Sequence, residues 1–197
     1  MSHNTDLMEE NKAAGRRVAL VTGASQGLGA EIAVALARDG CDVAVSSRRV
    51  EKLADTLERV AATGARAVPV ELDLRSQPGI EMAMAQAVGA FGHVDTLVNN
   101  AAVTLRRPVL EVTLQEWDLV MAVNLTGTFF MSQQMGRHLI AARAAGCSEK
   151  YSARDGVSTV PGAIALTRMP CSAHSTASIR VIWMIPALEI PYAERCA

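Results

Sequence analysis

A glycine-rich segment, Thr22-Gly-Ala-Ser-Gln-Gly-Leu-Gly29, stands between a short apolar run and a helical pattern. Gly23 permits a sharp turn out of a strand, Gly27 lets the backbone approach a pyrophosphate, and Gly29 lets a helix pack close to a sheet. The amides that open such a helix point at phosphates, and the helix dipole favours their negative charge. The segment therefore predicts a dinucleotide site. Its candidate contact residues are Gly23, Ser25, Gln26, Gly27, Leu28 and Gly29.

The next polar segment bears on the choice between NAD and NADP. About 20 residues after such a loop, an acidic side chain binds the ribose 2'-hydroxyl of NAD, and an arginine accepts the 2'-phosphate of NADP. Here the second apolar run ends in Ser46-Ser47-Arg48-Arg49, with no carboxylate. A guanidinium makes charge-assisted, often bidentate, bonds to phosphate. The pattern favours NADP(H) over NAD(H), with Ser47 and Arg48 as contacts. The alternative is two solvated arginines at a helix start.

Strands and helices are expected to alternate around these segments. Short apolar runs predict strands at 17–22, 41–47, 65–72 and 94–98, and helical spacing predicts helices at 29–39, 50–62, 79–90 and 114–142. Parallel strands need crossover connections, which are right-handed. The expected fold class is α/β, a doubly wound parallel sheet (Rossmann fold), in a single domain with an incomplete C-terminal half. We divide the chain into a polar tail (1–15), a dinucleotide-binding region (16–142) and a diverged remainder (143–197).

Composition excludes several classes of protein. With 197 residues the chain fits one domain, and a net charge of −1 lacks the basic face that nucleic acids require. No apolar run is long enough to span a bilayer or to form a signal peptide, so we expect a cytoplasmic protein with no membrane partner. The cysteines do not have the spacing of metal ligands, so we expect no metal site. They are Cys41, Cys147, Cys171 and Cys196.

Further motifs give a resemblance to a known family. The TGxxxGxG spacing, followed by Asn99-Asn-Ala-Ala102 after the fourth expected strand, resembles the short-chain dehydrogenase/reductases. Leu72-Asp73-Leu74 and Val123-Asn-Leu-Thr-Gly127 match the family in order. The resemblance implies an NAD(P)(H)-dependent oxidoreductase that passes hydride between the nicotinamide and a small carbonyl or alcohol substrate.

The resemblance also implies roles for individual residues. Asp73 and Leu74 would lie near the adenine ring, and the main chain of Asn124 would help to hold a proton-relay water. The residues that would lie beside the adenosine ribose and the central strands are Asn100, Ala101 and Ala102. The family uses the helix that matches 114–142 for dimer contacts. Because this segment is apolar on more than one face, we expect a homo-oligomer.

The family's catalytic residues are a serine and a Tyr-x-x-x-Lys pair, and two alignments of the tail are open. In one, Tyr151-Ser-Ala-Arg-Asp155 resembles the tyrosine segment, with an aspartate at the lysine position. In the other, residues 162–168 resemble the helix after the lysine, which puts Pro161 at the lysine position and Val157 at the tyrosine position. Ser148 is the candidate serine by its distance from Asn124. The candidate catalytic residues are therefore Tyr151, Asn124 and Ser148.

The last third departs further from the family. Residues 141–156 contain no Val, Ile, Leu, Phe or Thr, which is typical of a helix end and loop and not of a buried strand. A sheet that lacks its central fifth strand would have an exposed edge and an unfilled core. Residues 179–181 and 185–186 resemble the region of the sixth strand. Three hypotheses are open: an active oxidoreductase, a module that binds NADP(H) or joins an intact relative without turnover, and a product that does not fold stably.

Overall fold

The computed structural model describes residues 16–144, 164–167 and 181–184, with the side chains of 16–142. Its sheet has the order β3-β2-β1-β4-β6-β5. Every neighbouring pair is parallel except β5 and β6, which are antiparallel. The doubly wound arrangement is therefore confirmed, with one antiparallel strand at its edge. The strands are β1 (Val18–Val21), β2 (Asp42–Ser47), β3 (Ala67–Glu71), β4 (Thr96–Asn99), β5 (Ile164–Thr167) and β6 (Val181–Met184).

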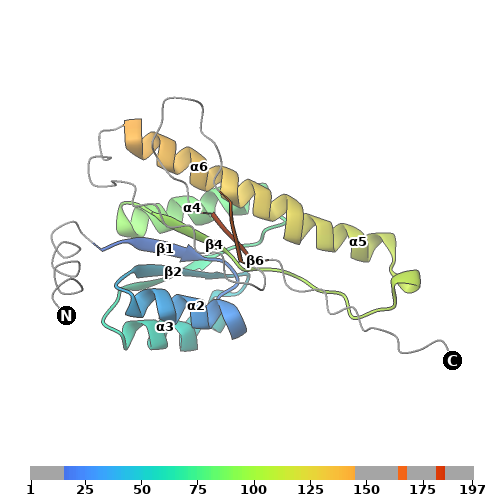
Figure 1. Ribbon diagram of the computed structural model, residues 1–197, viewed down its shortest axis with the longest axis horizontal. Helices are drawn as coiled ribbons and strands as arrows, with labels where there is room; N and C mark the ends of the chain where they lie inside the picture. Colours follow the sequence, from blue (N-terminus) through green and yellow to red (C-terminus); the bar gives the residue numbers. More distant parts are fainter. Residues whose placement is uncertain (1–15, 145–163, 168–180, 185–197) are drawn as a thin grey trace.

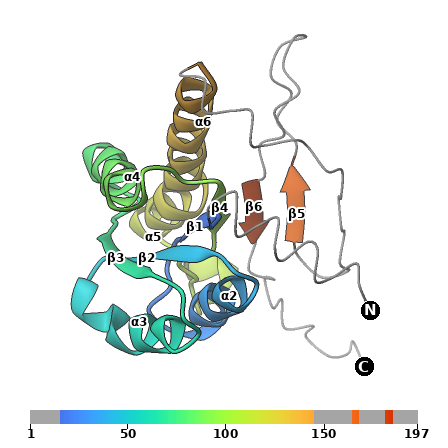
Figure 2. The same cartoon turned by 90° about the vertical axis from the view of Figure 1, so that its left-hand side faces the viewer.

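Helices cover both faces of the sheet, as Figures 1 and 2 show. On one face lie α2 (Gly27–Arg38) and α3 (Ala54–Ala61), which follows the 3-10 turn η1 (Val50–Leu53). On the other lie α4 (Gln77–Phe91) and α6 (Thr128–Ala144). The expected helices are thus confirmed within a few residues at their ends. No helix in the described part of the chain is long and apolar enough to cross a membrane.

The long helix expected over 114–142 is built from three pieces. After the 3-10 turn η2 (Val109–Glu111), α5 (Leu114–Met121) is joined to α6 by a π-helical turn, η3 (Ala122–Gly127). In Figure 1, α5 projects beyond the edge of the sheet toward which β1 points. Thr113 and Glu116 form a capping box at the start of α5. This reciprocal pairing satisfies backbone donors that the helix itself leaves unpaired.

The apolar pattern of the strands explains the two cores. Every residue of β1 is buried, because helices cover the strand from both sides. One core packs β1 and β4 residues against α4 and α6, and includes Leu20, Leu97 and Met131. The other packs the opposite faces against α2 and α3, and includes Val43 and Val60.

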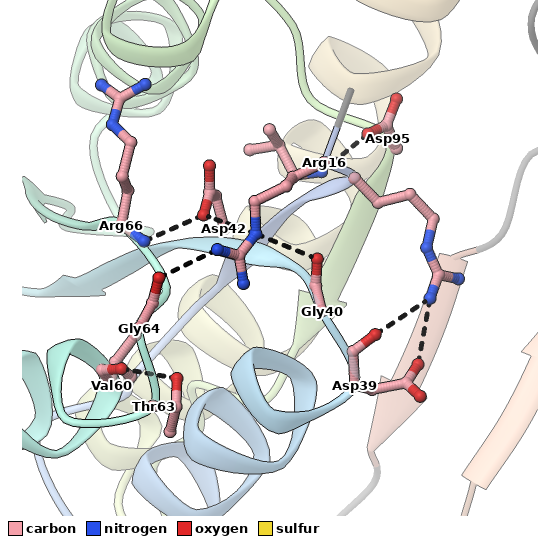
Figure 3. A network of polar contacts seen from close by, with 11 residues as sticks. Arg16, Asp39, Gly40, Asp42, Val60, Thr63, Gly64, Arg66 and Asp95 are labelled. Carbon is pink, nitrogen blue, oxygen red and sulfur yellow. Dashed lines mark hydrogen bonds and ion pairs between the residues drawn. The ribbon is translucent and has the colours of Figure 1, made fainter. Parts of the chain in front are cut away.

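The edge of the sheet at which the strands begin is closed by internal polar contacts (Figure 3). The Arg16 side chain donates to the carbonyl oxygens of Gly40 (3.3 Å) and Gly64 (2.9 Å), and its Nε lies 3.3 Å from Oδ1 of Asp42. Asp42 also accepts the backbone N–H of Arg66 at 2.9 Å. Since these groups satisfy one another, the opposite edge is the better place to look for a ligand site.

Two expectations for the tail are corrected. The edge of β4 is not left open, because β6 pairs with it, with Val98 opposite Ile182. Residues 164–167 form a strand and not the helix that one alignment implied, because this short apolar run pairs with β6, with Leu166 opposite Ile182. The interpretation of residues 145–156 as loop lies outside the described residues.

Candidate functional site

The loops that follow β1 and β4 meet at the point where the strand order reverses. Oγ1 of Thr22 accepts the backbone N–H groups of Asn100 and Ala101, both at 3.0 Å. In return, Nδ2 of Asn100 donates to the carbonyl oxygens of Thr22 (2.9 Å) and Gly23 (3.1 Å). Ligands of open α/β sheets bind in the crevice at such a reversal. The glycine loop is therefore held rigidly where a ligand is expected.

Two of the three loop glycines are required by close packing. Gly23 has φ +68°, and a Cβ there would lie 2.7 Å from the Cα of Ala101. At Gly29 a Cβ would collide with Nδ2 of Asn100 and with the carbonyl oxygen of Gly23. Both glycines let the loop after β1 approach the loop after β4, which agrees with the turn and packing roles expected for them.

Gly27 differs because the space beside it is open. Its φ is +61°, and no atom lies within 4 Å of an added Cβ. The next helix, α2, begins without a side-chain cap from Gln26 and has no acidic residue in its first turn. By contrast, Ser76 caps α4, its Oγ accepting the N–H of Gly79 at 3.1 Å. The first N–H groups of α2 thus lack an internal side-chain partner and border open space, which fits an anionic pyrophosphate.

The glycine loop is also fixed from the side of β2 and α3. Ala24 donates its N–H to the carbonyl oxygen of Ser46 at 2.8 Å, and the buried Thr56 donates its hydroxyl to the carbonyl oxygen of Ala24, also at 2.8 Å. The sequence carries no signal for this role of Thr56, a single threonine within a helix. At the open side, Leu28 is 64% exposed. The loop therefore presents an apolar side chain as well as amides.

At the end of β2, the two predicted contact residues have different surroundings. The hydroxyl of Ser47 donates to the carbonyl oxygen of Arg49 and accepts the N–H of Arg49 at 3.0 Å. This hydroxyl therefore shapes the turn into η1 and is nearly buried. The side chain of Arg48 is exposed and follows directly. Arg48 is therefore the better placed of the two residues to contact a ligand, because the Ser47 hydroxyl already bonds within its own turn.

Asp73, 25 residues after Arg48 in the chain, brings a carboxylate to the neighbouring strand end. The N–H of Leu72 donates to the carbonyl oxygen of Ser47 at 3.0 Å, so Asp73 and Arg48 stand at neighbouring strand ends. Oδ1 of Asp73 accepts the backbone N–H and the Nε–H of Arg75, both at 3.0 Å. Hydrogen bonds from Arg75 lower the pKa of Asp73, and the charge of Arg48 lowers it further. The sequence alone does not reveal that Asp73 and Arg48 are neighbours, because the pairing of β2 with β3 brings them together.

The π-helical turn places Asn124 against the loop after β4. Its Nδ2 donates to the carbonyl oxygen of Val103 at 2.8 Å, and its Oδ1 accepts the N–H of Val103 at 2.9 Å. The Asn124 side chain therefore satisfies both the N–H and the carbonyl oxygen of Val103, as the backbone of a neighbouring strand would. At Gly127, the helix passes so close to Leu74 that a Cβ would lie 2.6 Å from the Cβ of that leucine. Both contacts lock the long helix to the site loops.

A second polar row continues from β4 into α6. Nδ2 of Asn99 donates to Oγ of Ser132 at 3.0 Å, and Ser132 donates to the carbonyl oxygen of Thr128 at 2.8 Å. Oδ1 of Asn99 and Oγ of Ser46 are buried without a hydrogen-bond partner. A buried polar atom without a partner calls for an explanation, such as a water, an ion or a functional role. The third such atom in the described residues, Nε2 of His93, precedes β4 and lies away from this site. Asn99 and Ser46 both belong to the carboxyl ends of their strands.

Part of the predicted site lies outside the described residues. These are Tyr151 and Ser148, together with Asp155, Val157 and Pro161, on which the two alignments of the tail depend. The structure thus brings together the nucleotide half of the prediction and leaves the catalytic pair unplaced. Within residues 16–144 and the two described strands beyond them, no group of three or more His, Cys, Asp or Glu side chains could hold a metal ion.

The match to known proteins covers the nucleotide half of the chain and ends near the start of the undescribed region. A family model described as short chain dehydrogenase matches residues 17–147. The chain is 44% identical over 125 residues to 2-dehydro-3-deoxy-D-gluconate 5-dehydrogenase of Escherichia coli (strain K12), covering 64% of this chain and 49% of that protein. The chain spans about half the length of the curated relatives it matches.

Solved structures give the same result. A metagenomic short-chain oxidoreductase in complex with NADP aligns with a TM-score of 0.60 at 36% identity, over 64% of this chain and 58% of that one. A short-chain type dehydrogenase/reductase from Mycobacterium marinum aligns with a TM-score of 0.62 at 30% identity, over 64% and 51%. Residues 17–147, which the family model matches, contain the glycine loop and the loop after β4.

Proposed function

The chain belongs to the short-chain dehydrogenase family, and on that premise we propose that residues 16–142 form an NADP(H)-binding region. The observation that carries the proposal is the uncapped start of α2 beside the open space at Gly27. Helix N-termini bind phosphate groups through free N–H donors and a favourable dipole. Ser25, Gln26 and Leu28 complete this pyrophosphate loop.

The adenosine half is assigned to the ends of β2, β3 and β4. Arg48, exposed at the end of β2, meets the 2'-phosphate, and Ser47 shapes the turn that presents it. Asp73 and Leu74 border the adenine ring. The ribose lies against the loop formed by Asn100, Ala101 and Ala102. A relative that is 36% identical was solved in complex with NADP, which supports the choice of cofactor class for this site.

We propose that the whole protein is an oxidoreductase that acts on a small carbonyl or alcohol substrate. When bound, the nicotinamide supplies or accepts the hydride. The chain must then supply or take up a proton, and Tyr151 is the candidate acid/base, with Ser148 as the candidate for orienting the substrate oxygen. Asn124 fixes the loop after β4 through its two hydrogen bonds to Val103, and we assign its main chain the relay-water role.

A second candidate function is binding without turnover. The observation that favours it is Asp155, which stands four residues after Tyr151 where the family has a lysine. An anion there would raise the pKa of the tyrosine, whereas a lysine would lower it. The region 143–197 would then serve no catalytic step, and the chain would hold NADP(H) or join an intact relative through its long helix.

The pyrophosphate assignment is tested with a matched pair of glycine variants. Gly27 and Gly64 both have positive φ, +61° and +82°, and neither has an atom within 4 Å of an added Cβ. Gly27→Ala and Gly64→Ala therefore carry similar backbone strain, but only the first fills the proposed phosphate space. We expect both to lower the melting temperature, and only Gly27→Ala to abolish the rise that NADPH produces by binding the folded state. Equal NADPH responses in the two variants would contradict the assignment.

The cofactor preference is tested at Arg48. NADPH should bind more tightly than NADH, and Arg48→Ala should remove most of that preference, because the guanidinium pairs with the 2'-phosphate. Fluorescence titration measures both affinities. Equal wild-type affinities, or an unchanged ratio in Arg48→Ala, would show that the arginine is a solvated surface residue.

We also propose that the chain is a homo-oligomer through its long helix. Apolar side chains are exposed along α5, η3 and α6, among them Leu114 (69%), Trp117 (55%), Leu125 (52%) and Phe129 (46%). Exposed apolar side chains that gather on one surface favour an interaction site. Light scattering should give a mass of at least two chains, and Trp117→Glu should reduce it. A monomer at high protein concentration would exclude the interface.

A further inference from the structure

The ion pair between Asp73 and Arg75 is unusually well formed for a surface contact. Both side chains are partly exposed, at 33% for Asp73 and 48% for Arg75. Nε of Arg75 lies 3.0 Å from Oδ1 and 3.1 Å from Oδ2 of Asp73, and Nη2 also donates to Oδ2. The backbone N–H of Arg75 donates to Oδ1 as well. Arginine has the planar fork that holds a carboxylate in this bidentate way.

The position of this pair gives it electrostatic consequences for the neighbouring strand. In the β2–β3 register, Ser47 is opposite Glu71, and the N–H of Leu72 also donates to the carbonyl oxygen of Ser47. Arg48 directly follows Ser47, and Asp73 directly follows Leu72. The Asp73 carboxylate and the Arg48 guanidinium proposed to bind a 2'-phosphate therefore belong to neighbouring strand ends, where the charge of Arg48 lowers the pKa of Asp73. An unpaired carboxylate there would attract Arg48 and repel a phosphate dianion, and both effects would oppose NADP(H).

We propose that Arg75 is a specificity-determining residue that favours 2'-phosphorylated adenosine by engaging the Asp73 carboxylate and so leaving Arg48 free for the phosphate. This inference rests on the proposed function, because it assumes that the adenosine site lies at these strand ends. Arg75 is a positioning residue: it acts through Asp73 and does not itself touch the ligand.

The charge state of Asp73 agrees with this role. Hydrogen bonds from Arg75 are the largest cause of the lowered pKa of Asp73, and the positive charge of Arg48 is a smaller one. Asp73 is therefore ionised at neutral pH, and the two arginines act on the same carboxylate. If Arg75 were removed, Arg48 would be the only one of these two arginines left to balance the negative charge of Asp73.

The test compares ligands that differ only in the 2'-phosphate. Adenosine 2',5'-bisphosphate and AMP bind through the adenosine half alone, so calorimetric affinities for them do not depend on the nicotinamide side. We expect Arg75→Ala to lower the ratio of these affinities about 1.5- to 5-fold, the range for loss of a partly exposed charge interaction. The matched control is Arg38→Ala, which removes one positive charge at the far end of α2 and should leave the ratio unchanged.

A double variant separates action through Asp73 from direct contact. Asp73→Asn removes the carboxylate without changing its size, so Arg75→Ala combined with Asp73→Asn should recover most of the lost preference. Any weakening of adenine binding by Asp73→Asn affects both ligands and cancels in the ratio. An unchanged ratio in Arg75→Ala, or a double variant as impaired as Arg75→Ala, would overturn the role of Arg75 alone. Failure of the wild type to bind either ligand would overturn the nucleotide site, and this inference with it.

Discussion

Gly127 is the position where one added methyl group should do most damage to the long helix. A Cβ there would lie 2.6 Å from the Cβ and 2.9 Å from the carbonyl carbon of Leu74, and closer still to its carbonyl oxygen. Ordinary carbon contacts are about 3.5–4.0 Å, so the helix and the loop after β3 would have to separate by about 1 Å. Since most of these atoms belong to the backbone, no side-chain rotation relieves the overlap.

We expect Gly127→Ala to cost about 1–3 kcal/mol of unfolding free energy, the usual range for overpacking. For a folded region of this size, that corresponds to a melting temperature lower by about 4–12 °C. The control is Gly136→Ala in α6, where no atom lies within 4 Å of an added Cβ. There the better helix propensity of alanine should raise stability by up to about 1 kcal/mol. Circular dichroism melts and urea titrations measure both variants. If Gly127→Ala were as stable as Gly136→Ala, the close approach of helix and loop would be wrong.

Three further outcomes are expected. Burial is the main cause that lowers the pKa of His138 below 6.5, so the folded state binds this proton less readily than the unfolded state does. The contribution of His138 to the free energy of unfolding should therefore be fully present above pH 6.5 and be lost as the pH falls below it. Urea titrations at pH 7.5 and 5 check this, and His138→Gln should lose part of the difference; an equal difference would exclude His138 as its source. Asn124→Ala leaves both backbone groups of Val103 unpaired and should cost about 1–3 kcal/mol, whereas a loss below about 0.5 kcal/mol in urea unfolding would contradict the pairing. With NADPH and a panel of ketones, absorbance should show very slow turnover or none, because no lysine follows Tyr151 by four residues; robust turnover abolished by Tyr151→Phe would refute this.

Much of the nucleotide half could be predicted because its determinants are local. The glycine spacing at 23, 27 and 29 and the buried runs that precede it specify a strand, a tight turn and a helix start. The helix start near residue 114 also has a local signal, since Thr113 followed by Glu116 is the pattern of a capping box. Such features depend on neighbours within a few residues.

The remaining features depend on contacts that sequence spacing does not reveal. The hydrogen bond of Thr56 to Ala24 spans 32 residues, and the proximity of Asp73 to Arg48 arises from strand register. The sequence predicts cofactor contact for Ser47 but gives no sign that its hydroxyl also bonds within its own turn. The π-helical turn also gave no signal, because 114–142 is apolar on several faces and predicts one continuous helix.

That π-helical turn sets the rotational phase of α6. A π-helical turn holds one residue more than the α-helical turn it replaces, and each residue advances an α-helix by about 100°. Deleting one residue within 122–127 would keep the helix continuous but rotate everything after it by about that angle. Met131 and Met135, both fully buried, would then leave the core, and other faces of α6 would meet the sheet. The buried face of α6 is thus specified upstream of the helix, by a single extra residue.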